Sequence, residues 1–365
     1  MSKLIIPARQ DFPELEFGRW TMNGKPVYEI EVKTVINFTS EFGDKKLSDG
    51  YTFSLGSACA FKCVFCYVAS VWRKHPQICR LLKRLKHGGI GFEDIVIRRS
   101  NALDILREQL TIKKPGFVDL SAPHVIFTSP FVDPAANMVL VHETLDACLI
   151  IFALTNWDIR ILSKSSLLKN LAEKIPEQFR DRIIFGLSTG TFDDRLAGSF
   201  EQGTTLVSHR LKALHWLQDN GFRTFGMICP SLPQENYSEF ACRMAKAIRV
   251  DRCEHVWGEV INVRGNSLNA TVDALRNGGF RSEADRLTDV CGPRATPRWE
   301  TYARQTFQGL MEHIPAGKLR FLQYVKPQTR DWWASHADHG ALLLGTHRIA
   351  APDRKETHGL QPVRP

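Results

Sequence analysis

Three cysteines near residue 60 have a spacing that suits a metal centre. They are Cys59, Cys63 and Cys66, and they form the pattern C-x-x-x-C-x-x-C on one short stretch of chain. Protein-bound 4Fe–4S clusters are normally held by four cysteine thiolates. Three cysteines without an obvious fourth ligand would leave one iron open to bind a substrate or cofactor. The spacing therefore predicts a 4Fe–4S cluster with an open iron.

Other uses of these cysteines explain the pattern less well. A structural zinc site takes four ligands, usually as two spaced pairs, and the sequence has no second C-x-x-C pair. The nearest further thiol, Cys79, lies in a basic stretch. A redox pair of Cys63 and Cys66 would not explain Cys59. Three unrelated core cysteines, and a metal-binding scaffold without catalysis, also stay open as alternatives.

The composition indicates a reduced, soluble enzyme. The chain has 365 residues, a net charge of +9 and nine cysteines scattered without a disulfide framework. An odd number of unpatterned cysteines favours a reducing compartment, so we expect a cytoplasmic protein. The first residues become charged too early for a signal peptide. No apolar run approaches the roughly 20 residues that cross a bilayer, so no membrane association is expected. The positive charge allows an anionic partner such as nucleic acid.

Short apolar runs alternate with helical patterns along the chain. This alternation predicts a parallel sheet with helical crossovers, here a partial (β/α)6 barrel of the TIM type. In such barrels the chemistry lies on loops at the carboxyl ends of the strands, and the cysteines follow the first predicted strand. The six predicted strands are Tyr51–Leu55, His124–Phe127, Asp158–Leu162, Ile183–Leu187, Arg223–Ile228 and His255–Val260.

The regions around the predicted barrel differ from it in composition. We expect an N-terminal extension over 1–50, with an extended segment at Val27–Phe38, before the barrel core at 51–265. A helical region at 266–344 and a flexible tail at 345–365 would follow. Residues 73–99 are rich in basic side chains, which form either a solvated face or a binding patch. These are Arg73, Lys74, Arg80, Lys83, Arg84, Lys86, Arg98 and Arg99.

Several further segments, in order, resemble one branch of the radical S-adenosylmethionine (radical SAM) superfamily: spore photoproduct lyase and its DNA-repair-photolyase-like relatives. The resemblance covers about residues 35–265. It rests on the stretch Asn37–Tyr67, the Thr/Ser–Asp–Pro loop in Phe127–Pro134, the motif Ile161–Ser165, the stretch Leu187–Leu211, and Met227–Pro233. One departure is that the Thr128-Ser129-Pro130 loop lacks the cysteine that the spore lyase uses as a hydrogen-atom donor. Dimer repair is therefore not carried over to this chain.

The resemblance implies a role for each matching residue. Cys59, Cys63 and Cys66 would bind the cluster, whose open iron chelates the amino and carboxylate groups of S-adenosyl-L-methionine. Phe65 and Tyr67 would flank the adenine. These residues would form the core of the cofactor site.

Polar residues after other strands would complete that site. Lys164 would pair with the cofactor carboxylate, unless it is an ordinary surface lysine. Ser129 and Ser188 would offer hydroxyl groups to the ribose or the methionine moiety, unless they only end turns or strands. Asp133 would orient the cofactor or cap its own turn. Glu201 and Arg210 are expected to form an ion pair that fixes the loop after the fourth strand. No substrate-side catalytic residue is predicted.

The resemblance also implies the reaction and the partners. The reduced cluster would cleave S-adenosylmethionine to a 5′-deoxyadenosyl radical, which abstracts hydrogen from the substrate. A small electron-donor protein of the flavodoxin or ferredoxin type would supply the electron. The branch and the charge favour a nucleic-acid or nucleotide substrate; a peptide or small metabolite stays open. Trp299, Trp332 and Trp333 could stack on bases, although core packing is the simpler interpretation. Cys229 could face the barrel mouth, and Cys242, Cys253 and Cys291 are irregularly spaced for a second cluster.

Overall fold

A nine-stranded sheet forms the centre of the computed structural model, which describes residues 21–72, 76–86, 91–112, 119–128, 130–261, 266–292 and 296–345. Its strand order is β15-β14-β13-β12-β10-β9-β8-β4-β3, and every pairing is parallel except that of β3 with β4. The strands are β3 (Ile36–Asn37), β4 (Tyr51–Phe53), β8 (Val125–Thr128), β9 (Asp158–Ser163), β10 (Ile183–Ser188), β12 (Arg223–Ser231), β13 (Val256–Val260), β14 (Leu319–Tyr324) and β15 (Ala341–Leu344).

All six strands predicted from the sequence are present, in the predicted order. The sheet then continues with β14 and β15, which lie in the region expected to be helical. These two strands were missed because Arg320 and Gln323 interrupt the apolar run of β14, and short runs of this kind carry little periodicity. Among the described strands β15 and β3 are the two edges, so the sheet is an open barrel and does not close.

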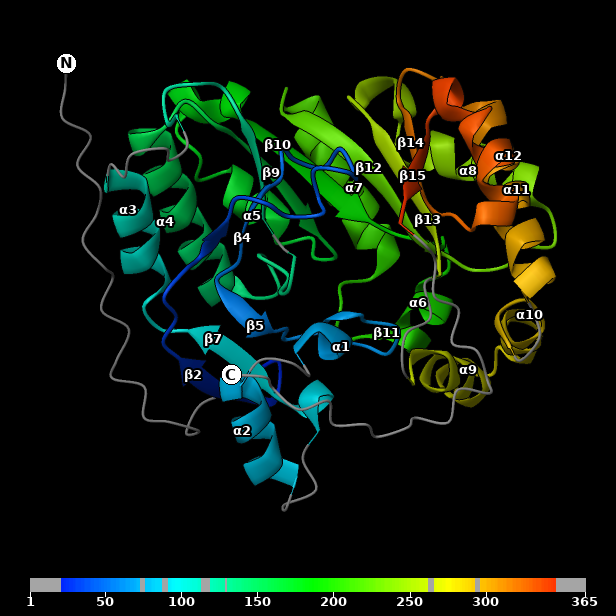
Figure 1. Ribbon diagram of the computed structural model, residues 1–365, viewed down its shortest axis with the longest axis horizontal. Helices are drawn as coiled ribbons and strands as arrows, with labels where there is room; N and C mark the ends of the chain where they lie inside the picture. Colours follow the sequence, from blue (N-terminus) through cyan, green and yellow to red (C-terminus); the bar gives the residue numbers. More distant parts are fainter. Residues whose placement is uncertain are drawn as a thin grey trace.

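Helices cover the outer face of this sheet, as Figure 1 shows. The apolar α4 is almost surrounded by protein, and the Asn137 side chain begins it by accepting a hydrogen bond from the Leu140 amide at 3.1 Å. The α-helices that follow the strands are α3 (Ala102–Thr111), α4 (Met138–Leu154), α5 (Leu168–Ala172), α6 (Asp194–Phe200), α7 (Val207–Asp219), α8 (Tyr237–Ala247), α9 (Ser267–Asn277), α10 (Arg281–Cys291), α11 (Thr296–His313) and α12 (Arg330–Ala334). Short 3-10 turns are η1 (Phe92–Asp94), η2 (Glu177–Arg182), η3 (Val250–Arg252), η4 (Pro327–Thr329) and η5 (Ala337–His339). Together the helices and the sheet enclose the main hydrophobic core.

The inner face of the sheet is filled by its own side chains and by the segment 38–50. Phe225 packs so closely over Gly186 that a Cβ there would lie 2.2 Å from its ring. Arg160 donates to the Leu47 carbonyl at 2.7 Å, and Trp257 Nε1 donates to the Lys45 carbonyl at 2.8 Å. These bonds satisfy backbone carbonyls of the inserted segment inside the barrel. The inner face therefore has a packed floor, also formed by Leu47, Phe127, Ile184, Met227, Leu322 and Leu344.

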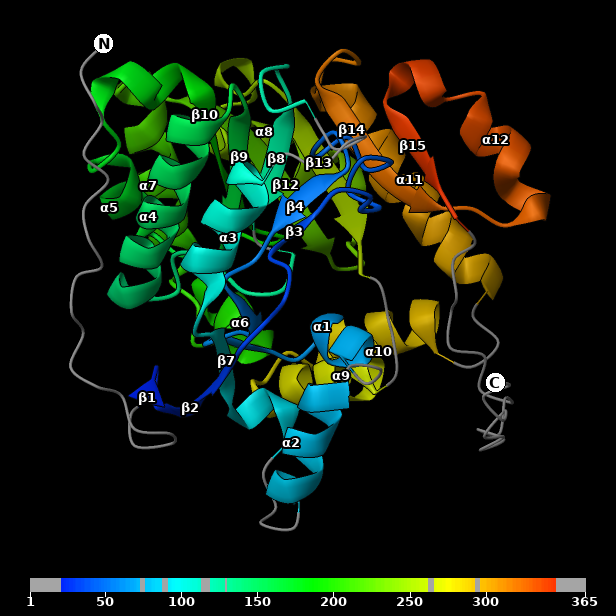
Figure 2. The ribbon, with the colours of Figure 1, turned by 60° about the vertical axis from the view of Figure 1, so that its left-hand side comes forward.

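A separate small sheet lies beneath the open barrel (Figures 1 and 2). Its order is β1-β2-β7-β5, and β5 leads directly into the cysteine loop. Its strands are β1 (Thr21–Met22), β2 (Lys25–Ile30), β7 (Val96–Arg99) and β5 (Gly56–Ala58), and nearby lie the two-stranded pair β6 (Lys62–Cys63) and β11 (Glu201–Gln202) and the helices α1 (Val68–Trp72) and α2 (Pro76–Lys86).

The small sheet changes two expectations from the sequence. The extended segment predicted at Val27–Phe38 is divided between β2 and β3, which belong to different sheets. The cysteine loop does not follow β4 directly, because β5 intervenes. The proposed domain boundaries stay predictions, and most of the tail at 345–365 lies outside the described residues. Within the described part, no helix is both long enough and apolar enough to cross a bilayer.

Candidate functional site

The three cysteines lie on one loop between β5 and α1. Cys59 follows β5, Cys63 ends β6, and Cys66 directly precedes Tyr67 and α1. The Cys59 sulfur accepts hydrogen bonds from the amides of Phe61 at 3.4 Å and Asp133 at 3.3 Å. Backbone amides aimed at a sulfur favour the thiolate, which is the form that binds metal. These two amides therefore oppose the effect of burial, which by itself disfavours the thiolate of Cys59.

The surroundings of the three sulfurs decide whether they suit a cluster. Burial raises the pKa of all three thiols, that of Cys59 to about 12. For Cys63, the Glu201 carboxylate raises the thiol pKa further, the Lys164 ammonium group lowers it, and the thiols of Cys66 and Cys59 also raise it. Bound iron would supply the compensating positive charge. This set of three thiols fits a cluster better than it fits free thiolates.

No group of three or more His, Cys, Asp and Glu side chains in the described residues is arranged to hold a metal ion. That finding concerns ligands gathered around one ion. In a 4Fe–4S cluster each cysteine binds a different iron atom, so the sulfurs do not share one centre. The donor set of the loop is thus compatible with a cluster.

A second segment of the chain pairs with the cysteine loop. The short strand β11 pairs antiparallel with β6, so that Glu201 is the register partner of Cys63. The Glu201 side chain is 1% exposed and forms ion pairs with Lys164 Nζ at 2.6 Å and with Arg210 Nη2 at 2.7 Å. The expected pair of Glu201 and Arg210 is confirmed, and Lys164 joins it. Burial alone would raise the pKa of Glu201, but the two cations outweigh burial and lower it.

Lys164 lies at the end of β9, where it links three neighbouring strand ends. Its Nζ donates to Ser188 Oγ at 3.0 Å and to the Cys229 carbonyl at 3.0 Å, and lies 5.6 Å from the centre of the Phe65 ring. Ser188 Oγ donates in turn to the Cys229 carbonyl at 2.9 Å. The Lys164 side chain is 15% exposed, so it is not an ordinary surface lysine. The structure thus brings Phe65, Lys164 and Ser188 together beside the cysteine loop.

Asp133 connects the second strand loop to the third. One carboxylate oxygen accepts from Ser163 Oγ at 2.7 Å and from the Ala135 amide at 2.9 Å, and the other accepts from the Lys164 amide at 2.6 Å. These bonds show that Asp133 caps its own turn and orients the Lys164 backbone. The Tyr67 hydroxyl donates to the Pro130 carbonyl in the same loop. Ser129, the remaining predicted residue, lies outside the described residues.

Polar side chains continue around the rim of the barrel on β12, where Cys229 was expected to face the barrel mouth, and on β13 and β14, for which no site residue was predicted. Three of these side chains are Cys229 on β12, Glu259 on β13 and Tyr324 on β14. Each lies two residues after an apolar residue of the inner floor. Alternate residues of a strand share a face, so these three point inward above the floor. The Cys229 sulfur lies 3.6 Å from Glu259 Oε2. The change from apolar to polar with a period of two residues was the signal in the sequence that could have revealed Glu259 and Tyr324.

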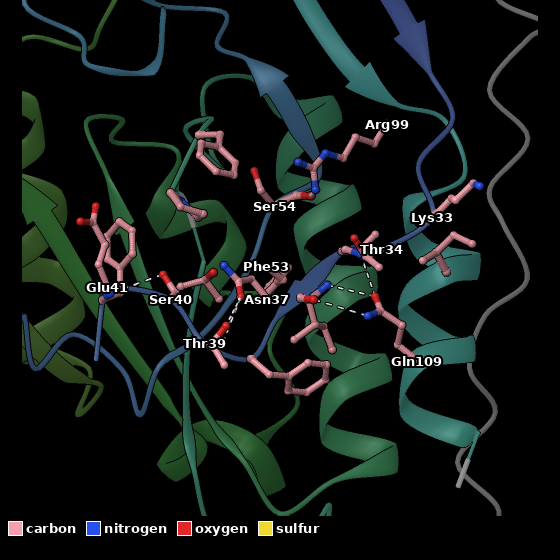
Figure 3. Close-up of a pocket in the computed structure, with 18 of the residues that line it drawn as sticks. Lys33, Thr34, Asn37, Thr39, Ser40, Glu41, Phe53, Ser54, Arg99 and Gln109 are labelled. Carbon is pink, nitrogen blue, oxygen red and sulfur yellow. Dashed lines mark hydrogen bonds between the residues drawn. The ribbon is translucent and has the colours of Figure 1, made fainter. Parts of the chain in front are cut away.

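A cavity of about 820 Å³ opens beside this site (Figure 3). It lies between the segment 33–42, α3 and the loop that carries Pro130 and Phe131, and it includes Tyr67. The cysteines, Lys164 and Ser188 do not line it. Its charged lining residues are balanced, with Lys33 and Arg99 against Glu41 and Glu108. The cavity therefore adjoins the predicted cofactor site through Tyr67 and has no excess of positive charge.

Parts of the predicted basic segment have structural roles. Arg98 forms ion pairs with Glu29 and Glu143, and Arg99 donates to the Ser54 carbonyl at 3.0 Å. Lys83 on α2 is exposed, whereas Arg73 and Lys74 lie outside the described residues. Among the basic side chains of this segment whose burial is described, those exposed are Arg80 and Lys83, both on α2.

Other predicted aromatic and thiol groups are part of the core. Trp299 and Trp333 are buried, and Trp332 packs on Trp333, so the core interpretation of these tryptophans holds. Cys253 and Cys291 are buried and Cys242 is half-buried, and the three lie on different parts of the fold.

Comparisons with known proteins place the fold. No family model and no curated protein matches this sequence. The structure is similar to spore photoproduct lyase: a tyrosine-to-phenylalanine mutant matches with a TM-score of 0.56 and 12% identity, over 88% of this chain and 89% of that one. A cysteine-to-serine mutant matches with a TM-score of 0.50 and 14% identity, over 74% and 73% of the two chains. At this identity the likeness concerns the fold, and the fold of this chain is that of spore photoproduct lyase, as its motifs predict.

Proposed function

We propose that this protein is a radical SAM enzyme that binds a 4Fe–4S cluster through Cys59, Cys63 and Cys66. The observation that carries the proposal is the position of Lys164 and Ser188, whose side chains meet beside the cysteine loop. When bound, a reduced cluster supplies the electron that cleaves S-adenosylmethionine into methionine and a 5′-deoxyadenosyl radical. The protein positions that cofactor and excludes side reactions.

The charges beside the loop suit a cofactor with a carboxylate group. Lys164 and Arg210 are two cations that share the single carboxylate of Glu201. Lys164 is the more exposed of the two cations, at 15% against 1%. A carboxylate approaching the site would meet its ammonium group first. The Phe65 ring offers a flat apolar face for the adenine.

The substrate would occupy the other half of the rim. Cys229 lies next to Ser188, and Glu259 and Tyr324 follow apolar residues of the inner floor on the neighbouring strands. We propose a nucleic-acid or nucleotide substrate. Because the charges that line the cavity are balanced, its phosphates would contact the exposed basic residues of α2 instead. A peptide or small metabolite is the alternative. A one-electron donor of the flavodoxin or ferredoxin type would reduce the cluster, and we propose that the enzyme acts in the cytoplasm.

Anaerobic reconstitution with iron and sulfide tests the proposal. We expect a brown protein that releases 5′-deoxyadenosine when it is reduced with S-adenosylmethionine present, even without substrate. Cys63→Ala should abolish the colour and the product. Cys79→Ala, which changes a thiol on α2, should spare both. A colourless protein with stoichiometric zinc, or a brown protein without product, would favour a non-catalytic scaffold.

A further inference from the structure

A lysine of the small sheet reaches the cysteine loop from below. Asn23 and Gly24 connect β1 to β2 with positive φ angles of 51° and 76°, so Lys25 is the first residue of β2. Asparagine followed by glycine is the preferred pair for a tight hairpin turn of this kind. The Asn23 side chain donates to the Ala136 carbonyl at 3.3 Å and so ties the turn to the start of α4. The hairpin therefore presents Lys25 from a fixed position.

The Lys25 side chain bonds to the backbone of the cysteine loop itself. Its Nζ donates to the Cys59 carbonyl at 3.0 Å and to the Phe61 carbonyl at 2.7 Å. The residue is 9% exposed. Both carbonyls belong to the turn that separates Cys59 from Cys63, so these bonds hold the spacing between the first two cysteines.

No carboxylate of the described residues pairs with the charge of Lys25. Within the described part of the chain, no Asp or Glu side chain lies at ion-pair distance from Lys25 Nζ, whereas Lys62 in the same loop pairs with Asp94 at 2.8 Å. Burying an ammonium group without a counter-charge is costly. Burial lowers the pKa of Lys25, while the neighbouring thiols of Cys59 and Cys63 act in the opposite direction and raise it. Cluster-bound thiolates would supply the missing negative charge.

We infer that Lys25 is a positioning residue for the iron–sulfur cluster, which fixes the cysteine loop through two carbonyls and places a buried positive charge beside the thiolates. The inference rests on the proposed cluster. A buried positive charge stabilises the more negative, reduced form of the cluster. Lys25 thereby favours acceptance of the electron that starts the reaction.

The test compares Lys25→Met with Lys62→Met, which removes an exposed lysine from the same loop. In the iron-free proteins, alkylation of Cys59, Cys63 and Cys66 is followed by mass spectrometry, with enough reagent that opening of the loop, and not the reactivity of the thiols, limits the rate. In the reconstituted proteins, the midpoint potential is measured by redox titration with electron paramagnetic resonance. Lys25→Met should raise the alkylation rates severalfold and lower the affinity of the cluster for the electron about tenfold, a shift of about −59 mV for one electron. Lys62→Met should leave both unchanged, and Lys25→Arg should restore most of the potential.

The outcomes separate this inference from the proposed function. If the wild type holds no cluster, the proposed function fails, while the alkylation rates still report on the loop. If the wild type holds a cluster and Lys25→Met leaves the potential and the alkylation unchanged, the role of Lys25 is refuted. If Lys25→Met does not fold, Lys25→Gln replaces it, because glutamine keeps a hydrogen-bond donor and removes the charge. The same measurements are made on Lys25→Gln, and the same outcomes support or refute the role of Lys25.

Discussion

Replacing Glu201 by glutamine would remove the carboxylate that pairs with both Lys164 and Arg210 beside the cysteine loop. Glutamine has nearly the same shape and keeps an oxygen that accepts hydrogen bonds. Lys164 and Arg210, whose nitrogens lie 2.6 Å and 2.7 Å from the Glu201 carboxylate, would then lose the carboxylate that they share. The change isolates the effect of charge from that of packing.

The structure sets the size of the expected effect. Removing one partner of a buried ion pair costs about 3–5 kcal/mol, because a charge remains buried without compensation. Arg210 cannot turn toward water, since it also donates to the Thr205 and Ser188 carbonyls at 2.7 Å and 2.9 Å. We therefore expect Glu201→Gln to lower the free energy of unfolding by about 3–5 kcal/mol. Lys164→Met leaves Glu201 paired with Arg210 and should cost about 1–3 kcal/mol.

Urea unfolding, followed by tryptophan fluorescence and circular dichroism, measures these costs. The double variant Lys164→Met with Glu201→Gln should cost less than the sum of the single changes by about 0.5–3 kcal/mol, because only one unpaired cation remains. Glu173→Gln is the matched control: its carboxylate is 43% exposed and pairs with Lys169 at 3.5 Å, so the change should stay within about 0.5 kcal/mol. A cost for Glu201→Gln equal to that of the control, or strictly additive costs in the double variant, would refute the reasoning.

Four further outcomes are expected. The pKa of Glu201 is lowered in the folded protein from its ordinary value of 4.5. The ionised carboxylate therefore contributes its full stabilisation above pH 4.5 and loses it as the pH falls through the lower pKa of the folded state. In urea titrations below pH 4.5, the wild type should lose stability more steeply than Glu201→Gln. Gly190→Ala would place a Cβ 1.8 Å from the Pro230 carbonyl oxygen and should cost at least the upper end of roughly 1–3 kcal/mol, whereas Gly198→Ala, in open space on α6, should be neutral or stabilise by up to about 1 kcal/mol in the same assay. Lys164→Ala should keep the cluster spectrum and weaken the binding of S-adenosylmethionine about tenfold to a hundredfold in equilibrium dialysis, since a hydrogen bond to a charged group is worth about 1.5–3 kcal/mol; unchanged affinity would remove Lys164 from the cofactor site. If α2 contacts phosphates, replacing Lys83, Arg84 and Lys86 by glutamine should flatten the salt dependence of nucleic-acid binding by up to about three units, and a wild type without such binding at low salt would direct the search to peptides and metabolites.

Local patterns were enough to predict the strands and the cysteine loop. The six predicted strands are apolar runs bounded by turns, and the three cysteines are close in sequence, so neither depends on distant contacts. β14 escaped prediction because Arg320 and Gln323 break its apolar run, and only pairing with β13 and β15 makes it a strand.

Long-range contacts account for what the sequence did not predict at the site. Lys25 is 34 residues from Cys59, and nothing in its local sequence shows that its ammonium group reaches that carbonyl. Strands of two residues, such as β6 and β11, are too short to show any periodicity. Likewise, the ion pair between Lys164 and Glu201 could not be predicted, because it forms only where the loops after β9 and β10 lie together.

The pairing of Glu201 with Cys63 has a consequence for how the protein is made. Roughly 140 residues separate the two partners, so the cysteines leave the ribosome well before the segment that clasps them. At about 5–20 residues per second, the delay is roughly 7–28 s. During that time the thiols are exposed to oxidants and to competing metals in the cell. Insertion of the cluster is therefore expected to follow synthesis of the chain to at least β11, and oxygen present during expression should damage the nascent loop more than the finished protein.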